Sequence, residues 1–255
     1  MSRRSSIWCS PDGTYGLLDR AVDVWRTTLN SSSADLSKLS GSLSSEERER
    51  ADRFRWEQDR ARFMLGRIMA RSVLGHCLQK PASTIQLAVD HAGKPVVASP
   101  SETPPLHFNI SHAGDYVLLA LARDRRVGVD VEQISDIRDL NEIAARCFSK
   151  AEYSRLQTIP ERMRPQSFYR CWTLKEAYLK ARGDGLSLPL ESFDVAFLPG
   201  EMPRLLETRF DPADAARWCL RELDMGSAYL AAVAIEVAPE LELRLWDWPS
   251  HRENG

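Results

Sequence analysis

The sequence predicts an α+β protein made of two similar lobes. Each half of the chain shows the same order of elements, namely one strand, then helices, then a run of short strands. The closing strands also resemble each other, with Gly114-Asp-Tyr-Val-Leu-Leu-Ala-Leu-Ala in the first half and Gly226-Ser-Ala-Tyr-Leu-Ala-Ala-Val-Ala in the second. We therefore expect an N-terminal lobe over 1–126, a C-terminal lobe over 127–237 and a tail over 238–255. Two such lobes meeting face to face would form a cleft, and the active site is expected there because clefts are usual places for a ligand.

In the first half, apolar residues predict a strand over 22–29. A Ser-rich loop follows, and Ser44 with Glu47 three residues later is a capping box that begins a helix. The helical pattern continues to about residue 78, with a break near 56–59. Four short extended pieces close this half, at 85–89, 95–98, 106–110 and 116–122.

The second half begins with a strand over 127–134. Three helical patterns follow, at about 139–147, 150–158 and 164–182, and extended pieces return at 193–198, 205–208, 218–223 and 229–237. Pro165 suits the first position of the third helix, and Gly183 lies where a left-handed residue would end it. In the tail, Trp246 and Trp248 are expected to pack on a neighbouring surface.

Composition excludes several classes of protein. The net charge of -2 gives no overall basic field for nucleic acid. The five cysteines contain no CxxC pair, which fits reduced thiols better than a disulfide framework or a zinc site. The N-terminus lacks the apolar core of a signal peptide, and no apolar run reaches membrane-spanning length. We expect a soluble, cytoplasmic protein that binds neither nucleic acid nor a membrane.

The helix over 164–182 carries the most informative stretch, Trp172-Thr-Leu-Lys-Glu-Ala-Tyr-Leu-Lys180. Residues four apart share a helix face, so Trp172, Glu176 and Lys180 form one column. If Trp172 packs into the core, the two charged groups lie at its rim, where lost hydration demands a strong partner. The alternative is an ordinary surface Glu–Lys pair, worth only about 0.2–0.5 kcal/mol.

A second stretch, Gly128-Val-Asp-Val-Glu132, opens the second half. On a strand, Asp130 and Glu132 project to one face while the valines point to the core. Neighbouring carboxylates repel, so a cation should lie between them, and Mg²⁺ is the natural candidate because it prefers carboxylate oxygen. The alternatives are a solvated face of an edge strand, or carboxylates balanced by Arg125 and Arg126.

Three further features carry single basic side chains. In Phe108-Asn-Ile-Ser-His-Ala-Gly114, His112 is expected in a turn at a strand end, where its imidazole can donate to phosphate or serve only as a surface or capping group. Gly93-Lys-Pro95 is a tight turn that presents Lys94. The first long helix is rich in arginine, which alone indicates a solvated face. Arg62, flanked by Ala61 and Phe63, is the arginine expected to reach inward.

Together these motifs resemble the 4′-phosphopantetheinyl transferase superfamily, specifically the larger two-lobed type related to the surfactin-synthetase activator. The likeness covers about residues 45–195 in family order, and the predicted strand order extends it to about 237. The matching motifs are Gly128-Val-Asp-Val-Glu132, Trp172-Thr-Leu-Lys-Glu-Ala-Tyr-Leu-Lys180, Phe108-Asn-Ile-Ser-His112, Gly93-Lys-Pro95, Phe148-Ser-Lys-Ala-Glu-Tyr153 and Gly185-Leu-Ser-Leu-Pro189.

The resemblance implies transfer of the phosphopantetheine arm of coenzyme A to a serine of an apo acyl or peptidyl carrier protein, with release of 3′,5′-ADP. It implies that Asp130, Glu132 and Glu176 hold Mg²⁺ against the pyrophosphate. Glu176 would also take the serine proton, directly or through water. Lys180 would contact the pyrophosphate and ease departure of the leaving group.

Contacts with coenzyme A are also implied by the resemblance. The residues concerned are Arg62, Lys94, His112, Lys175, Lys180 and Arg50. Arg62 and His112 resemble phosphate contacts, Lys94 resembles a contact at the nucleotide end, and Lys175 is expected near the same anion as Lys180. Family members often carry lysines for the 3′-phosphate at the start of the long helix. Glu46 and Glu47 stand in that region here, and Arg50 is the nearest basic residue.

The sequence leaves the carrier protein open among those of fatty acid, polyketide and nonribosomal peptide synthesis. Two fused lobes predict a monomer, because one chain already supplies both walls of the cleft. Two other functions use the same residues. One is a metal-dependent phosphohydrolase or nuclease, and the other is a non-catalytic paralogue that binds coenzyme A or a carrier protein.

Overall fold

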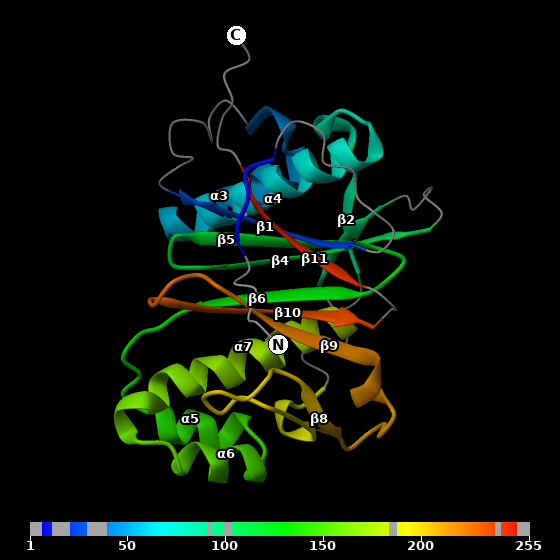
Figure 1. Cartoon of the computed structure of the whole chain (residues 1–255). Coiled ribbons are helices and arrows are strands. Elements are labelled where there is room, and N and C mark those ends of the chain that lie inside the picture. The colour runs from blue at the N-terminus through cyan, green and yellow to red at the C-terminus, as the bar shows by residue number, and fades with distance from the viewer. Residues whose placement is uncertain are drawn as a thin grey trace. The chain divides into compact units, whose positions relative to one another are not determined.

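A computed structural model describes residues 7–11, 21–29, 40–90, 93–98, 104–183, 188–237 and 241–248 (Figure 1). The chain divides into two compact units. The first unit comprises Met1–Val89, Pro95–Asp124 and Glu240–Gly255, and the second comprises Asp90–Lys94 and Arg125–Pro239. The main division, between Asp124 and Arg125, lies within two residues of the predicted boundary.

The first unit contains a four-stranded sheet in the order β11-β1-β5-β4 and a separate hairpin, β2-β3. Its elements are β1 (Ala21–Thr28), α3 (Ser45–Asp52), α4 (Glu57–Leu78), β2 (Leu87–Val89), β3 (Pro95–Val97), β4 (Leu106–Ala113), β5 (Tyr116–Arg123) and β11 (Glu242–Asp247). The predicted capping box is present at the start of α3, where Ser44 and Glu47 bond reciprocally. Helix α4 packs on the sheet through an apolar cluster that includes Leu65, Met69 and Leu119.

The second unit contains a three-stranded antiparallel sheet in the order β6-β10-β9 and a two-stranded pair, β7-β8. Its elements are β6 (Val127–Gln133), α5 (Leu140–Cys147), α6 (Lys150–Gln157), α7 (Arg164–Arg182), β7 (Phe193–Val195), β8 (Leu205–Thr208), β9 (Trp218–Leu223) and β10 (Tyr229–Glu236). Helix α7 begins with Pro165 in its first turn and ends at Gly183, whose φ of 82° is left-handed. Both signals act as the sequence predicts.

The two sheets repeat one strand order. In the first unit the opening strand β1 pairs with the closing strand β5, which pairs with β4. In the second unit β6 pairs in the same way with β10, which pairs with β9. All four pairings are antiparallel, and the two closing strands are those whose sequences resemble each other. The prediction of two similar α+β lobes is confirmed.

The segment after residue 240 differs from the predicted separate tail. Strand β11 pairs in parallel with β1 and so belongs to the sheet of the first unit. Asp23 of β1 is only 1% exposed, and Arg244 donates to its two oxygens at 2.6 and 2.7 Å. Trp246 donates to the same carboxylate at 2.9 Å and stacks on Trp25. A buried carboxylate with three donors explains why this distant segment is held against β1.

Two predicted features fall outside the described residues, namely most of the Ser-rich loop at 30–39 and residues 185–187 of the Gly185-Leu-Ser-Leu-Pro189 motif. Among the helices that the structure describes, none combines the length and the apolar character needed to cross a membrane.

Candidate active site

Strand β6 places two carboxylates on one face. Asp130 lies opposite Ala232 of β10, and Glu132 lies opposite Leu230. Val129 before Asp130 and Val131 between the two acids are buried, as predicted from the strand alternation. Asp130 is itself buried, with 3% of its surface exposed, whereas Glu132 is half-buried. The acidic pair is therefore not a solvated face of an edge strand.

Helix α7 presents the predicted column. Trp172, Glu176 and Lys180 are half-buried, while the residues between them are buried. The Nζ of Lys180 lies 2.5 Å from Oδ1 of Asp130. Lys180 thus pairs with Asp130 of the strand. The alternative, in which it forms only an ordinary surface pair with Glu176, is not supported. The helix motif and the strand motif meet at one place in the second unit.

Gly128 allows β6 and α7 to approach closely because glycine places no side chain between them. A Cβ atom at Gly128 would lie 2.3 Å from the carbonyl oxygen of Ala177 and 2.3 Å from the amide nitrogen of Ala181. Both atoms belong to the backbone of α7. The glycine of the Gly128-Val-Asp-Val-Glu132 motif is therefore explained by the close approach of helix and strand.

The three carboxylates influence one another electrostatically. Burial and then the charge of Asp130 raise the pKa of Glu132 to about 7, and Glu176 adds to the effect. Burial and then Asp130 also raise the pKa of Glu176. Lys180 opposes both shifts but does not cancel them. Such a cluster of acids around one lysine favours an additional cation.

The chemistry of these donors fits Mg²⁺, which binds carboxylate oxygen and usually keeps water and phosphate in its remaining positions. Asp130 is 3% exposed and its charge acts on both glutamates, so the three carboxylates lie close enough to interact. As the side chains stand, however, the described part of the chain contains no group of three or more acidic, histidine or cysteine residues that could hold a metal ion. Metal binding would therefore require the carboxylates to rearrange.

Lys94 lies beside the same helix end. Its Nζ donates to the carbonyl oxygen of Lys180 at 2.7 Å and to that of Val127 at 3.2 Å. These contacts place Lys94 in the second unit, where it links the start of β6 to the last turn of α7. Burial lowers the pKa of Lys94 to about 8. An ammonium has three donors, and among the residues that the structure describes these two carbonyl oxygens leave one N–H of Lys94 without an acceptor.

Lys175 requires a correction. Its side chain is 0% exposed, and its Nζ lies 2.6 Å from Oε2 of Glu152 and 2.6 Å from the carbonyl oxygen of Phe193. The ammonium also lies 4.2 Å from the centre of the Phe193 ring. Lys175 therefore holds the core of the second unit, and the predicted contact with the substrate anion is not available to it.

Ser149 with Glu152 three residues later is a capping-box pattern, and the sequence predicts no other role for Glu152. The structure confirms the capping box with Ser149, and it also shows that Oε1 of Glu152 accepts the backbone amide of Val195 at 2.8 Å. A single buried carboxylate thus joins α6, α7 and β7. Two features of the sequence could have predicted this contact. One is a lone lysine on the buried face of α7, and the other is a carboxylate at a cap position.

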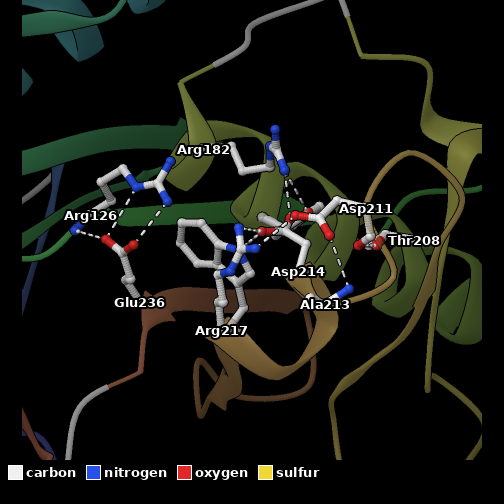
Figure 2. A network of polar contacts seen from close by, with 10 residues as sticks. Arg126, Arg182, Thr208, Asp211, Ala213, Asp214, Arg217 and Glu236 are labelled. Atoms are coloured by element: carbon white, nitrogen blue, oxygen red, sulfur yellow. Dashed lines mark hydrogen bonds and ion pairs between the residues drawn. The ribbon is translucent and has the colours of Figure 1, made fainter.

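The last turn of α7 is held by partly buried polar contacts around the buried Asp214 (Figure 2). Asp214 accepts from Arg182 of α7 at 2.5 Å and from Arg217 at 3.3 Å. Arg126, at the start of β6, pairs with Glu236 of β10 at 2.9 Å. Arg126 is therefore engaged with β10, so the alternative in which it balances the Asp130–Glu132 pair is not supported. These contacts hold the segments that position Lys180.

The remaining predicted residues belong to the first unit. Arg62 reaches inward as expected, donating to the carbonyl oxygen of Gly114 at 2.7 Å and pairing with Asp59 at 2.8 Å. His112 is exposed and lies within β4 opposite Val117, where a turn was predicted. Arg50 is exposed on α3, with its guanidinium 5.3 Å from the centre of the Phe63 ring. Their contacts with coenzyme A stay predictions.

Comparison with known proteins identifies the class of protein that this fold and these motifs define. A model described as 4′-phosphopantetheinyl transferase superfamily matches residues 126–234, and one described as 4′-phosphopantetheinyl transferase, N-terminal, matches residues 27–124. The chain is 36% identical to 4′-phosphopantetheinyl transferase HetI of Nostoc sp. over 228 residues, covering 89% of this chain and 93% of that protein.

Two Bacillus proteins extend the comparison. The chain is 35% identical to 4′-phosphopantetheinyl transferase psf-1 of Bacillus pumilus, covering 73% of this chain and 82% of that protein. It is 39% identical to 4′-phosphopantetheinyl transferase Sfp of Bacillus subtilis, covering 60% of this chain and 66% of that protein. The chain belongs to the 4′-phosphopantetheinyl transferase superfamily.

Proposed function

We propose that this enzyme transfers the 4′-phosphopantetheine arm of coenzyme A to a serine of an apo acyl or peptidyl carrier protein. The reaction would require Mg²⁺ and release 3′,5′-ADP. The observation that carries the proposal is the 2.5 Å pair between Lys180 and Asp130, formed beside Glu132 and Glu176. The cluster combines an anion-binding ammonium, a candidate base and carboxylate ligands for a metal, and membership of the family supports the same reaction.

In the proposed reaction the serine Oγ attacks the pyrophosphate phosphorus that carries the pantetheine arm. A bond forms between Oγ and this phosphorus, and its bond to the bridging oxygen breaks. The bridging oxygen leaves with its electron pair on 3′,5′-ADP. Negative charge builds on the phosphate oxygens and on the leaving group, and the Lys180 ammonium would stabilise it.

Glu176 is the proposed base for the serine proton. Its side chain is half-buried, and burial followed by the charge of Asp130 raises its pKa. A base is most effective when its pKa lies near the working pH, so a raised pKa suits this role. The proton would pass from serine Oγ to the Glu176 carboxylate, directly or through one water molecule.

Asp130, Glu132 and Glu176 are the residues proposed to hold Mg²⁺. When bound, this metal supplies Lewis-acid stabilisation of the pyrophosphate and helps to orient it. The burial of Asp130 and the raised pKa of both glutamates support this choice. The free N–H of Lys94 is proposed to meet the nucleotide end of coenzyme A, and Arg62 and His112 its phosphates.

The test is a transfer assay with the full chain, coenzyme A, Mg²⁺ and an apo carrier protein. Mass spectrometry should show the carrier gaining the phosphopantetheine arm, chromatography should show 3′,5′-ADP, and EDTA should stop both. Glu176→Gln should slow transfer about 10²–10⁴-fold, the usual contribution of a general base. Glu207→Gln is the matched control, because Glu207 is exposed on β8. Its transfer rate should equal that of the native chain.

The same assay separates the alternatives. A phosphohydrolase would release 3′,5′-ADP without any carrier protein, and a non-catalytic paralogue would bind coenzyme A and form no product. Full activity in a folded Glu176→Gln variant would exclude the role proposed for that residue. A panel of fatty acid, polyketide and nonribosomal peptide carriers would then identify the carrier class by the relative rates.

A further inference from the structure

Lys180 lies in the last turn of helix α7, which ends at Arg182. The last turn of a helix has carbonyl groups without intrahelical donors, and helix ends fray. A stable 2.5 Å contact between Lys180 and Asp130 therefore requires this turn to be held from outside the helix. One external contact is the Lys94 ammonium, which donates to the backbone carbonyl of Lys180.

A second set of contacts meets at Asp214, in the short 3₁₀-helix that precedes β9. Asp214 is 1% exposed. Its Oδ2 accepts the hydroxyl of Tyr178 and Nη1 of Arg182, the latter at 2.5 Å. Its Oδ1 accepts Nε1 of Trp218 at 3.2 Å and Nη1 of Arg217 at 3.3 Å. We refer to these four hydrogen bonds as the Asp214 network, part of which Figure 2 shows.

Two donors of the Asp214 network belong to α7 and lie on either side of Lys180 in the sequence. Tyr178 precedes Lys180 by two residues, and Arg182 follows it by two. Tyr178 and Arg182 are four apart and share a helix face, as their common contact with Asp214 shows. Residues two apart on a helix point about 160° away from each other, because each residue turns the helix by about 100°. Asp214 therefore holds the turn from the side opposite to the Lys180 side chain.

Both of these donors are held in place by aromatic rings. Tyr178 is 0% exposed, and its ring contacts that of Trp218 edge to face, with the ring centres 5.5 Å apart. The guanidinium of Arg182 lies 4.6 Å from the centre of the Phe210 ring. The packing restricts both side chains, so a contact with Asp214 restrains the helix backbone as well.

The Asp214 network also stabilises the ionised carboxylate. Burial alone raises the pKa of Asp214, but hydrogen bonds from Tyr178, Trp218 and Arg182 outweigh burial and lower it. Hydrogen bonds to an ionised group are about twice as strong as those between neutral groups. Replacing the carboxylate by an amide of the same shape should therefore weaken the hold on α7 without opening a cavity.

We propose that Asp214 is a positioning residue, which holds the last turn of α7 so that the Lys180 ammonium stays against Asp130. Its consequence for catalysis rests on the proposed function, in which Lys180 stabilises the charge that builds on the pyrophosphate. Asp214 acts through the helix, because its contacts lie on the side away from the Lys180 side chain. A displacement of about 1 Å in a catalytic group can cost about 10²-fold in rate, so looser positioning should lower kcat.

The kinetic test compares three variants of the full chain in the transfer assay. Asp214→Asn and Arg182→Gln weaken the same contact from its two ends, and the second alters a side chain that is already 20% exposed. Both should lower kcat about tenfold or more, with the KM for coenzyme A within about twofold of native. Arg217→Gln is the matched control, because Arg217 donates to the same carboxylate from the same short helix and does not contact α7 through it. Its kcat should equal that of the native chain.

A spectroscopic readout reports on Lys180 without any turnover. The chain has six lysines, so labelling them with ¹⁵N gives few ammonium signals in NMR, and Lys180→Gln identifies the signal of Lys180. Pairing with the buried Asp130 slows exchange of the ammonium protons with water. The Lys180 signal should be sharp in the native chain and in Arg217→Gln, and it should broaden or disappear in Asp214→Asn and Arg182→Gln.

The two readouts separate this proposal from the proposed function. A native Lys180 signal in folded Asp214→Asn and Arg182→Gln would overturn the proposal, even if kcat fell. Loss of the signal in both variants supports it, even if the native chain transfers no phosphopantetheine arm. Loss of the signal with native kcat would support the positioning by Asp214 and contradict the catalytic role of Lys180.

Discussion

The contact between Gly128 and helix α7 gives a quantitative test of how the candidate active site is assembled. In Gly128→Ala the new methyl group would meet Ala177 O and Ala181 N at 2.3 Å, and ordinary contact begins near 3.4 Å. Both atoms are backbone, so no side chain can rotate away. The helix must therefore move away from β6 by about 1 Å. Overpacking of this kind costs about 1–3 kcal/mol in protein cores. We expect a loss of at least about 3 kcal/mol in the free energy of unfolding, at the upper end of that range.

The same retreat should affect transfer. The 2.5 Å contact between Lys180 and Asp130 crosses the interface that Gly128 allows, and it would lengthen with the helix displacement. A misplacement of about 1 Å in a catalytic group can cost about 10²-fold in rate. The folded fraction of Gly128→Ala is therefore expected to transfer the arm about 10²-fold more slowly than the native chain.

Urea denaturation followed by circular dichroism measures the stability, and the carrier mass shift measures the rate. Gly41→Ala is the control, because a Cβ at Gly41 meets nothing within 4 Å. Its stability should stay within about 0.5 kcal/mol of native, as is usual for surface substitutions. A Gly128→Ala chain with native stability and native rate would refute the reasoning.

Two further predictions concern charged groups. Lys175→Met should cost about 3–5 kcal/mol in the free energy of unfolding, because it leaves the buried Glu152 carboxylate without its cation. Urea denaturation checks this, and native stability with weakened coenzyme A binding would restore a ligand role for Lys175. For Glu132 the folded pKa of about 7 lies above the ordinary value of 4.5, so the stability it contributes is present below pH 4.5 and lost as the pH rises through 7. Mg²⁺ in the presence of coenzyme A should therefore raise the melting temperature more at pH 8 than at pH 5.5. Glu132→Gln should remove this difference in scanning calorimetry, and an equal metal effect at both pH values would contradict the assignment.

The elements of the candidate active site could be predicted because their signals are local. The 2-residue period of β6 places Asp130 beside Glu132, and the 4-residue spacing on α7 aligns Glu176 with Lys180. Both arrangements follow from positions a few residues apart, and the structure confirms them. The spacing within each element does not predict the pairing of Lys180 with Asp130, because the two residues lie 50 positions apart along the chain.

The errors share a physical origin in contacts between distant segments. Lys175 precedes Glu176 by one residue, and the 100° step of a helix turns it away from the column and into the core. Its partners, Glu152 and the Phe193 carbonyl, become neighbours only when α6 and β7 pack on α7. Arg67 is one of many arginines in the predicted helix, and its ion pair with Glu47 forms only when α3 packs against α4.

The parallel pairing of β11 with β1 has a consequence for synthesis of the chain. The ribosome makes all of the second unit before it makes Glu242–Asp247, so until then the nascent first unit has an open strand edge. Unpaired strand edges promote association with other chains. The open edge of β1 includes Asp23, whose partner Arg244 has not yet been translated at that stage. A chaperone that shields nascent sheets should therefore bind this protein longest at that stage, and cleavage before Glu242 should leave a product prone to aggregate.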